Sequence, residues 1–275
     1  MADYIERHRL YQGAPAAGQC AYRLRACRLE LFYDEHNRQA AEMAGALARY
    51  HGPDPELLVV LGGDGTMLRA VRQCWRRRIP FYGVNIGHLG FLLNEQLPDR
   101  VANQDLVLWE LPLLYVELEY QDGSHQHAWA FNDTWVERAT GQTAWLEVRV
   151  DGQVRVPHLV ADGALVATAA GSTAYARAMG AVPLPLGTPA LLLVGSNVLR
   201  PVSWRPVVLP VTSEVTLTTL DPVKRPLQAY VDGVALGNVC RLRVRVSRVA
   251  SVEMVFTPPH DPAAKLAAIQ FPLHE

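Results

Sequence analysis

The chain has 275 residues and a mass of 30.4 kDa, a length that favours two modest domains over one core. Hydrophobic residues make up 49% and charged residues 19%, which is the composition of a globular protein. The net charge of −1 at pH 7 excludes a general electrostatic attraction to nucleic acid or to anionic membranes, so any phosphate site must be local.

The cysteines and the amino terminus exclude further classes of protein. None of the four cysteines forms a C-x-x-C pair, which removes the usual spacing of zinc sites and of thioredoxin-type redox pairs. The first ten residues are charged, and no stretch approaches the roughly 18 apolar residues that a membrane-spanning helix needs. We therefore expect a cytoplasmic enzyme with neither a membrane nor a nucleic-acid partner.

The first hundred residues alternate between short apolar strands and helices. The expected strands cover 28–33, 57–61 and 79–85, and the expected helices cover 34–50 and 66–78. This β-α-β-α-β order is typical of a doubly wound sheet. The sequence thus predicts an N-terminal α/β domain over residues 1–104.

Beyond residue 105 the pattern changes to strands separated by turns such as Asp122-Gly123 and Asp151-Gly152. The expected strands cover 113–120, 128–137, 144–150, 190–194, 207–209, 215–220 and 239–246. We predict a β-rich, sandwich-like domain over residues 105–258. The final segment, 259–275, is expected to return to the first domain.

The sharpest local feature is Gly62-Gly63-Asp64-Gly65-Thr66, at the point where an apolar strand meets a predicted helix. Glycines let phosphate oxygens approach the backbone, and a helix that follows offers free N–H groups and a positive dipole end. A carboxylate would repel a phosphate, so Asp64 suits a general base for a hydroxyl or a metal ligand. The alternative is that Asp64 only caps the helix and the glycines only form a turn.

Two familiar nucleotide-binding motifs are absent from the sequence. A G-x-x-x-x-G-K-S/T loop is impossible because the only lysines, Lys224 and Lys265, do not follow such a glycine pair. No G-x-G-x-x-G follows a predicted strand either. The P-loop and dehydrogenase classes therefore lose their main support.

Three further stretches carry polar groups beside glycines. They are Gly83–Leu92, the pair Asn132-Asp133, and the run from Asp162 to Tyr175, which passes through an apolar strand into a Gly-Ser-Thr cluster. Small residues with hydroxyls beside an aromatic suit close packing around a base and a ribose. Taken alone, each stretch fits an ordinary strand, loop or capped helix better than a binding site.

The order and spacing of these pieces together resemble the NAD kinase family. The resemblance rests on the Gly-Gly-Asp-Gly-Thr loop, N-x-G-x-L-G-F-L, the Asn-acid pair, D-G-x-x-x-x-T-x-x-G-S-T-A-Y, Arg205-Pro206 and Asp232-Gly233. It covers the chain from about Leu29 to the C-terminal region. Family membership implies an α/β domain and a β-rich domain with a dinucleotide in the crevice between them, in a homodimer or homotetramer.

The resemblance also implies a reaction and a set of site residues. The reaction is phosphoryl transfer from ATP, another triphosphate or polyphosphate to the 2′-hydroxyl of the adenosine ribose of NAD, with a divalent metal such as Mg²⁺. Asp64 matches the family's catalytic base. The positions implied to contact the substrates are Gly63, Gly65, Thr66, Arg69, Asn132, Asp133, Asp162, Thr173, Ala174, Tyr175 and Ala178.

The chain departs from the family pattern in the second domain. Ala169 and Ala170 replace a Pro-Thr pair, and Ala181 stands in a stretch that usually ends in Gly-Gly-Pro. The stretch that begins at Arg200, Arg-Pro-Val-Ser, replaces the family's Pro-His-Ser-Leu, so a histidine is absent. These differences leave the choice between NAD and NADH open, as well as the donor and the assembly contacts.

Two rival functions stay open at this point. Lipid kinases share the Gly-Gly-Asp-Gly-Thr loop, but the G-S-T-A-Y segment and the lack of a basic or amphipathic face argue against them. A catalytically silent NAD(P)-binding regulator on the same scaffold is the second rival. An intact Asp64 argues against it, whereas the altered second domain favours it.

Overall fold

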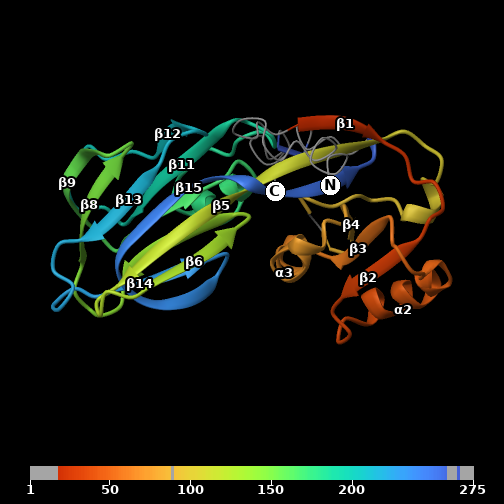
Figure 1. Cartoon of the computed structure of the whole chain (residues 1–275), viewed down its shortest axis with the longest axis horizontal. Helices are drawn as coiled ribbons and strands as arrows, with labels where there is room; N and C mark the ends of the chain where they lie inside the picture. The colour runs from red at the N-terminus through yellow and green to blue at the C-terminus, as the bar shows by residue number, and fades with distance from the viewer. Residues whose placement is uncertain (1–17, 88–89, 259–264, 267–275) are drawn as a thin grey trace, which may run out of the picture. The chain divides into compact units, whose positions relative to one another are not determined.

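The computed structural model describes residues 18–87, 90–258 and 265–266 (Figure 1). These residues fall into two compact units. The β-rich unit comprises Pro112–Leu184 and Thr188–Ala250, and the α/β unit comprises the other described residues. The fold class predicted from the sequence, an α/β part and a β-rich part, is confirmed. The predicted domain limits stay predictions, and most of segment 259–275 lies outside the described residues.

Three parallel strands form the centre of the α/β unit (Figure 1). β2 (Leu29–Tyr33) pairs with β3 (Leu57–Gly62), and β3 pairs with β4 (Phe81–Asn85). β4 in turn pairs in parallel with β15 (Val234–Phe256). The unit also holds β1 (Gly18–Tyr22), which pairs with β5 (Leu106–Tyr120), the helices α2 (Arg38–Leu47) and α3 (Asp64–Cys74), and the short turns η1 (Ala48–Tyr50), η2 (Trp75–Arg77) and η3 (Pro98–Arg100).

The apolar sequence of β3 follows from its position between two helices. All six of its residues are buried. One face packs with the buried alanines and leucine of α2 around Leu57, Val59 and Leu61. The other face of the sheet packs against α3. A Cβ at Gly83, on the neighbouring strand β4, would lie only 2.7 Å from Cε of Met67 in α3. Because β3 and β4 are parallel, the segments that follow them lie at the same edge of the sheet. Open α/β sheets bind ligands at this edge.

The second helix begins two residues earlier than the sequence predicts. α3 starts at Asp64, with Gly63 in extended conformation at its N-cap and no side-chain cap. Glycine is a poor helix former, so Gly65 concealed the first turn. The first helix begins at Arg38 because the Asn37 side chain accepts a hydrogen bond from the Ala40 amide at 3.1 Å.

The β-rich unit is a long, mostly antiparallel sheet in the order β12-β11-β10-β7-β14-β15-β13-β8-β9, with β5 pairing to β15 and to β6. Its strands are β6 (His125–Ala130), β7 (Asp133–Arg138), β8 (Ala144–Val150), β9 (Gln153–Ala161), β10 (Gly163–Ala167), β11 (Ala190–Ser196), β12 (Val207–Pro210), β13 (Val215–Thr219) and β14 (Leu227–Val231), besides parts of β5 and β15. Alternate residues of these strands form one apolar core. The short helices η4 (Ala170–Thr173) and α4 (Tyr175–Ala178) follow β10.

The expected strand 128–137 is wrong in one respect, because it is divided into β6 and β7 at Phe131 and Asn132. The amides of Phe131 and Asn132 donate instead to the carboxylate of Asp232, at 2.7 and 2.8 Å. The sequence pattern also missed β9 and β14. β9 was not predicted because most of its side chains are exposed. It therefore lacks the alternation of buried and exposed residues that indicates a strand.

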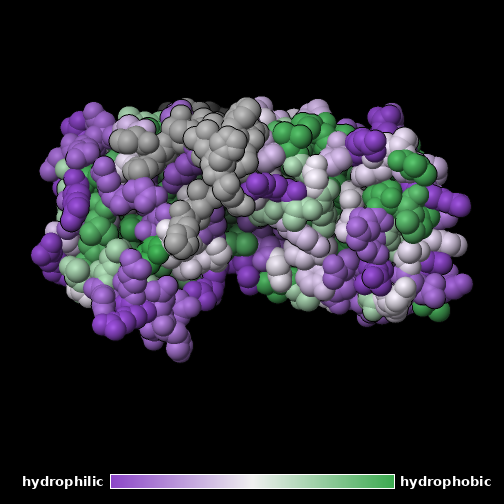
Figure 2. Space-filling view, turned by 180° about the vertical axis from the view of Figure 1, so that it is seen from behind, coloured by the Kyte–Doolittle hydropathy of each residue, from purple (hydrophilic) through white to green (hydrophobic). Residues whose placement is uncertain are grey.

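Hydrophilic residues predominate on the face shown in Figure 2, and hydrophobic residues form separate groups there. Large exposed apolar side chains include Val202 and Val223. None of the helices in the described part of the chain has the length and apolar character to cross a membrane.

Candidate active site

The carboxylate of Asp64 is held in a defined orientation by the backbone of a neighbouring loop. Its Oδ2 accepts a hydrogen bond from the Phe91 amide at 2.9 Å, and its Oδ1 accepts one from the Leu92 amide at 3.0 Å. Asp64 is the first residue of α3, so its side chain does not cap that helix. The Asp64 side chain therefore does not perform the capping role that the sequence left open.

The loop that holds Asp64 is itself fixed to the sheet. Asn94 is fully buried, and its Nδ2 donates to the carbonyls of Gly83 and Val255 at 3.1 and 3.0 Å. Its Oδ1 accepts from the Thr257 amide at 2.9 Å. This role of Asn94 was not predictable from the sequence, since a buried asparagine in a loop has no local pattern.

Glycines 63 and 65 face open space. A Cβ at either position would meet no described atom within 4 Å, and neither glycine has a positive φ. At Gly62, by contrast, a Cβ would lie 2.5 Å from Oγ1 of Thr66, so close packing of β3 against α3 explains that glycine. The absence of side chains at Gly63 and Gly65 is therefore unexplained by the fold, and it leaves the backbone beside Asp64 accessible to a ligand.

The remaining predicted positions in this unit are on α3. Thr66 donates its amide to the Gly63 carbonyl at 3.0 Å, which closes the first turn of the helix. The Arg69 guanidinium lies 5.8 Å from the centre of the Phe32 ring. The hydrogen bond from the His36 amide, and to a smaller extent the charge of Arg69, lowers the pKa of Asp34. Arg69 thus lies on the exposed side of the helix.

The predicted Asn-acid pair lies at the start of β7, beside a second buried carboxylate. Asp232 accepts hydrogen bonds from three successive amides, including that of Asp133 at 3.2 Å. Asp133 is only 4% exposed. Burial, together with the charge of Asp232, raises the pKa of Asp133 to about 7.

Asn132 connects this pair to the G-S-T-A-Y segment. Its carbonyl accepts from the Thr168 amide at 2.9 Å and from the Thr168 hydroxyl at 3.2 Å. A Cβ at Gly171 would lie 2.1 Å from the same carbonyl oxygen, so only glycine allows this approach. The Asn132 side-chain oxygen is buried without a hydrogen-bond partner among the described residues. An orphan buried acceptor of this kind is unusual in a folded protein.

Asp162 is already engaged by two polar side chains. Its Oδ1 accepts from Nε of Arg138 at 2.6 Å, and its Oδ2 accepts from Nδ2 of Asn197 at 2.7 Å. The hydrogen bond from Asn197, followed by that from Arg138, lowers the pKa of Asp162. The sequence identified Asp162 but neither of these partners, which come from the end of β7 and from the residue that follows β11.

Tyr175 is at one end of a row of three aromatic rings. Its ring meets that of Trp135 edge to face at 5.1 Å, and Trp135 stacks on Tyr230 at 4.7 Å. Burial, followed by the charges of Glu137, Asp133 and Asp162, raises the pKa of Tyr175. Asp133 and Asp162, the predicted carboxylates of this unit, thus lie close enough to Tyr175 for their charges to act on it.

The other predicted positions in this segment surround Tyr175. Thr173 is half-buried, and Ala174 and Ala178 are exposed. The departures at Ala169 and Ala181 are buried, and Ala181 belongs to a small apolar cluster with Ala176. These small residues let the segment pack on the outer side of β10 and β11.

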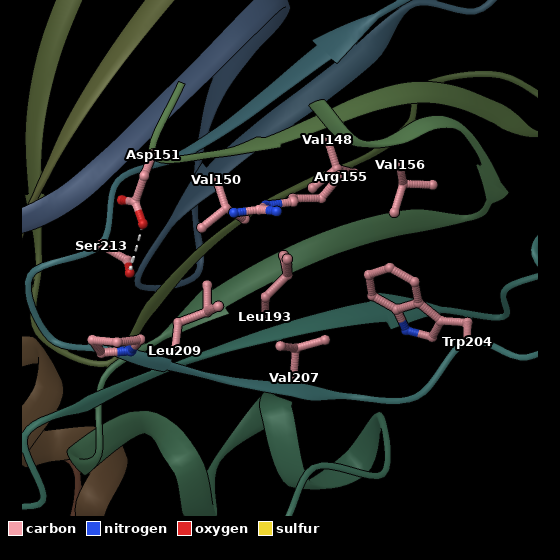
Figure 3. A pocket seen from close by; sticks show the side chains of 11 residues that line it. Val148, Val150, Asp151, Arg155, Val156, Leu193, Trp204, Val207, Leu209 and Ser213 are labelled. Carbon is pink, nitrogen blue, oxygen red and sulfur yellow. Dashed lines mark hydrogen bonds between the residues drawn. The ribbon is translucent and has the colours of Figure 1, made fainter. Parts of the chain in front are cut away.

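A cavity in the β-rich unit lies apart from the predicted residues. It has a volume of about 410 Å³, and in Figure 3 apolar side chains of β8 and β9 face those of β11 and β12 across it. Its lining residues are Val148, Val150, Asp151, Arg155, Val156, Leu193, Trp204, Val207, Leu209, Pro210 and Ser213. None of the predicted site residues lines it.

Metal ligands are not gathered among the described residues of either unit. Within the described ranges, no group of three His, Cys, Asp or Glu side chains is arranged to hold a metal ion. A resident metal site made by the chain does not fit these residues.

Comparison with known proteins gives a consistent result. A family profile described as the ATP-NAD kinase N-terminal domain matches residues 22–104. The NAD kinase of Cereibacter sphaeroides is 37% identical over 223 residues, which cover 80% of this chain and 87% of the relative. The NAD kinase of Rhizorhabdus wittichii is 35% identical over 240 residues, which cover 85% of this chain and 93% of the relative.

Solved structures share the fold. The crystal structure of yeast NADH kinase complexed with NADH matches with a TM-score of 0.73 at 20% sequence identity, covering 92% of this chain and 90% of that one. An NAD kinase from Archaeoglobus fulgidus in complex with ATP matches with a TM-score of 0.70 at 19% identity, covering 88% and 99%.

Proposed function

The chain belongs to the NAD kinase family, enzymes that phosphorylate NAD, and we propose that Asp64 is the base that activates the 2′-hydroxyl of the adenosine ribose. The observation that carries the proposal is the orientation of the Asp64 carboxylate by the amides of Phe91 and Leu92. An ionised carboxylate has about four lone-pair sites, so two amides leave capacity for a hydroxyl proton. Phosphoryl transfer needs little more than such positioning and neutralisation of charge.

The open backbone at Gly63 and Gly65 is proposed to receive the phosphoryl group. Gly63 is the N-cap residue of α3, and Gly65 lies in the first turn of that helix. The free amides and the positive dipole end at the start of a helix favour anions. The lack of any internal reason for glycine at these positions supports this role. Thr66, in the first turn of the same helix, and Arg69, in the second, are proposed to contact the substrates.

The β-rich unit is proposed to hold the dinucleotide. Asn132 offers a buried oxygen that accepts no hydrogen bond from the described residues. Asp133, with a pKa of about 7, is able either to donate or to accept a hydrogen bond from a ribose or amide group. Asp162 and the stretch Thr173–Ala178 are proposed to complete the binding surface around Tyr175.

The phosphoryl donor is proposed to be ATP, another triphosphate or polyphosphate. A divalent cation such as Mg²⁺ is proposed to arrive as part of the donor, since the described side chains form no three-ligand cluster for it. We also propose that the protein is cytoplasmic and that it forms a homodimer or homotetramer. Light scattering of the purified protein tests the oligomeric state.

A panel assay tests the proposed function. The purified protein is incubated with NAD, Mg²⁺ and each donor in turn, and NADP is measured with an NADP-specific dehydrogenase. We expect NADP with at least one donor and none without Mg²⁺. If NAD binds but no donor yields NADP, the silent NAD(P)-binding regulator replaces the kinase. Phosphorylation of a sphingoid base or diacylglycerol instead of NAD would identify a lipid kinase.

A further inference from the structure

Lys265 lies on the far side of the loop that holds Asp64. Its ammonium donates to the carbonyl of Gly90 at 2.9 Å and to the carbonyl of Leu93. The two residues between those carbonyls, Phe91 and Leu92, are the ones whose amides bind the Asp64 carboxylate. One short turn of chain thus presents its carbonyls to a cation and its amides to the proposed base.

The environment of Lys265 disfavours the charged form of its side chain. The side chain is half-buried, and that burial lowers the pKa of Lys265, while the charges of Glu95 and Asp64 oppose the shift. In the described part of the chain, Lys265 forms no ion pair with a carboxylate. Among the described residues, the ammonium therefore donates its hydrogen bonds to two backbone carbonyls, while Glu95 and Asp64 act on it through their charges.

The carbonyl contacts have a direct consequence for Asp64. An ammonium that binds two carbonyls limits rotation of the peptide units between them, and those units carry the amides of Phe91 and Leu92. A cation on the Gly90 carbonyl also polarises the peptide unit that carries the Phe91 amide, which strengthens the hydrogen bond that this amide donates to Asp64. Both effects fix the carboxylate in a single orientation.

We propose that Lys265 is a positioning residue for phosphoryl transfer, which orients Asp64 through the turn Gly90–Leu93. This inference rests on the proposed role of Asp64 as the base. It predicts that Lys265 affects the chemical step and the order of the turn, and has little effect on the binding of NAD.

Three variants separate this role from simple stabilisation. Lys265→Met keeps the length and the apolar stem but removes the charge, Lys265→Arg keeps the charge, and Lys224→Met is the control at the other, exposed lysine. We expect Lys265→Met to lower kcat by about tenfold to a hundredfold, the range for a misplaced reacting group. KM for NAD should change by less than about threefold. Lys265→Arg should recover most of the activity, and Lys224→Met should match the original protein.

A double-mutant cycle gives the decisive result. If Lys265 acts through Asp64, Lys265→Met should cause no further loss of kcat in the Asp64→Asn background. An equal fold-loss in both backgrounds would overturn the proposal. Hydrogen exchange at the amides of Phe91 and Leu92 provides a readout without catalysis, and it should accelerate in Lys265→Met. Unchanged exchange would also overturn the proposal, whereas absence of NADP formation by the original protein would instead overturn the proposed function.

Discussion

Gly65 is a residue at which stability and activity should respond in opposite directions. It lies in the first turn of α3, where alanine is favoured over glycine by up to about 1 kcal/mol. A Cβ there meets no described atom within 4 Å, so the fold should accept Gly65→Ala or gain slightly in melting temperature. We expect kcat/KM to fall at least about tenfold, because the methyl group occupies space proposed for the phosphoryl group. Full activity would show that no ligand approaches this glycine.

The buried carboxyl of Asp133 gives the stability of the protein a specific pH dependence. The folded protein holds this proton up to about pH 7, while the unfolded chain releases it near its ordinary pKa of about 4. The folded state therefore binds more protons between these values, and the free energy of unfolding falls as pH rises from 4 to 7.

Asp133→Asn removes the group that causes this loss. We expect the melting temperature of the variant, relative to the original protein, to increase as pH rises through the window from 4 to 7 and to level off above it. Calorimetry at pH 5 and pH 8 measures the difference. Asp105→Asn, at an exposed surface carboxylate, is the control and should show no such trend. A difference that is independent of pH would mean that Asp133 is ionised in the fold at pH 5.

At the scale of elements, the aromatic stack joins β7, β14 and α4. Trp135 lies between Tyr230 and Tyr175, so it sets the position of a ring proposed to contact the dinucleotide. Loss of an aromatic pair costs about 0.5–1.5 kcal/mol. We expect Trp135→Leu to raise KM for NAD by about twofold to tenfold with little change in kcat, while Trp135→Phe stays near the original value. A fall in kcat alone would contradict this assignment.

Elements with a strong period were predictable, and elements shaped by distant contacts were not. β3 was evident from its unbroken apolar run, because both of its faces are buried. The break between β6 and β7 was not evident, because the group that creates it, Asp232, is about a hundred residues away in the chain. β9 was hidden because its exposed residues carry no alternating pattern.

At the scale of the whole molecule, the sequence indicated which residues are chemically unusual but not what holds them. Asp64 was conspicuous among its glycines, and its carboxylate is indeed held by backbone amides. Lys265 and Asn94 could not be identified, since their contacts depend on how distant segments fold together. Each unit has its own apolar core, in keeping with the two-part composition of the sequence.

The most direct test of the account is the activity of Asp64→Asn with saturating NAD, Mg²⁺ and the best donor. We predict that kcat for NADP formation falls by about a hundredfold or more, as expected for loss of a positioned base. The dissociation constant for NAD, measured by calorimetry, should stay within about threefold, and the exposed control Asp54→Asn should keep full activity. An Asp64→Asn variant that forms NADP at the original rate would contradict the central claim that Asp64 is the catalytic base.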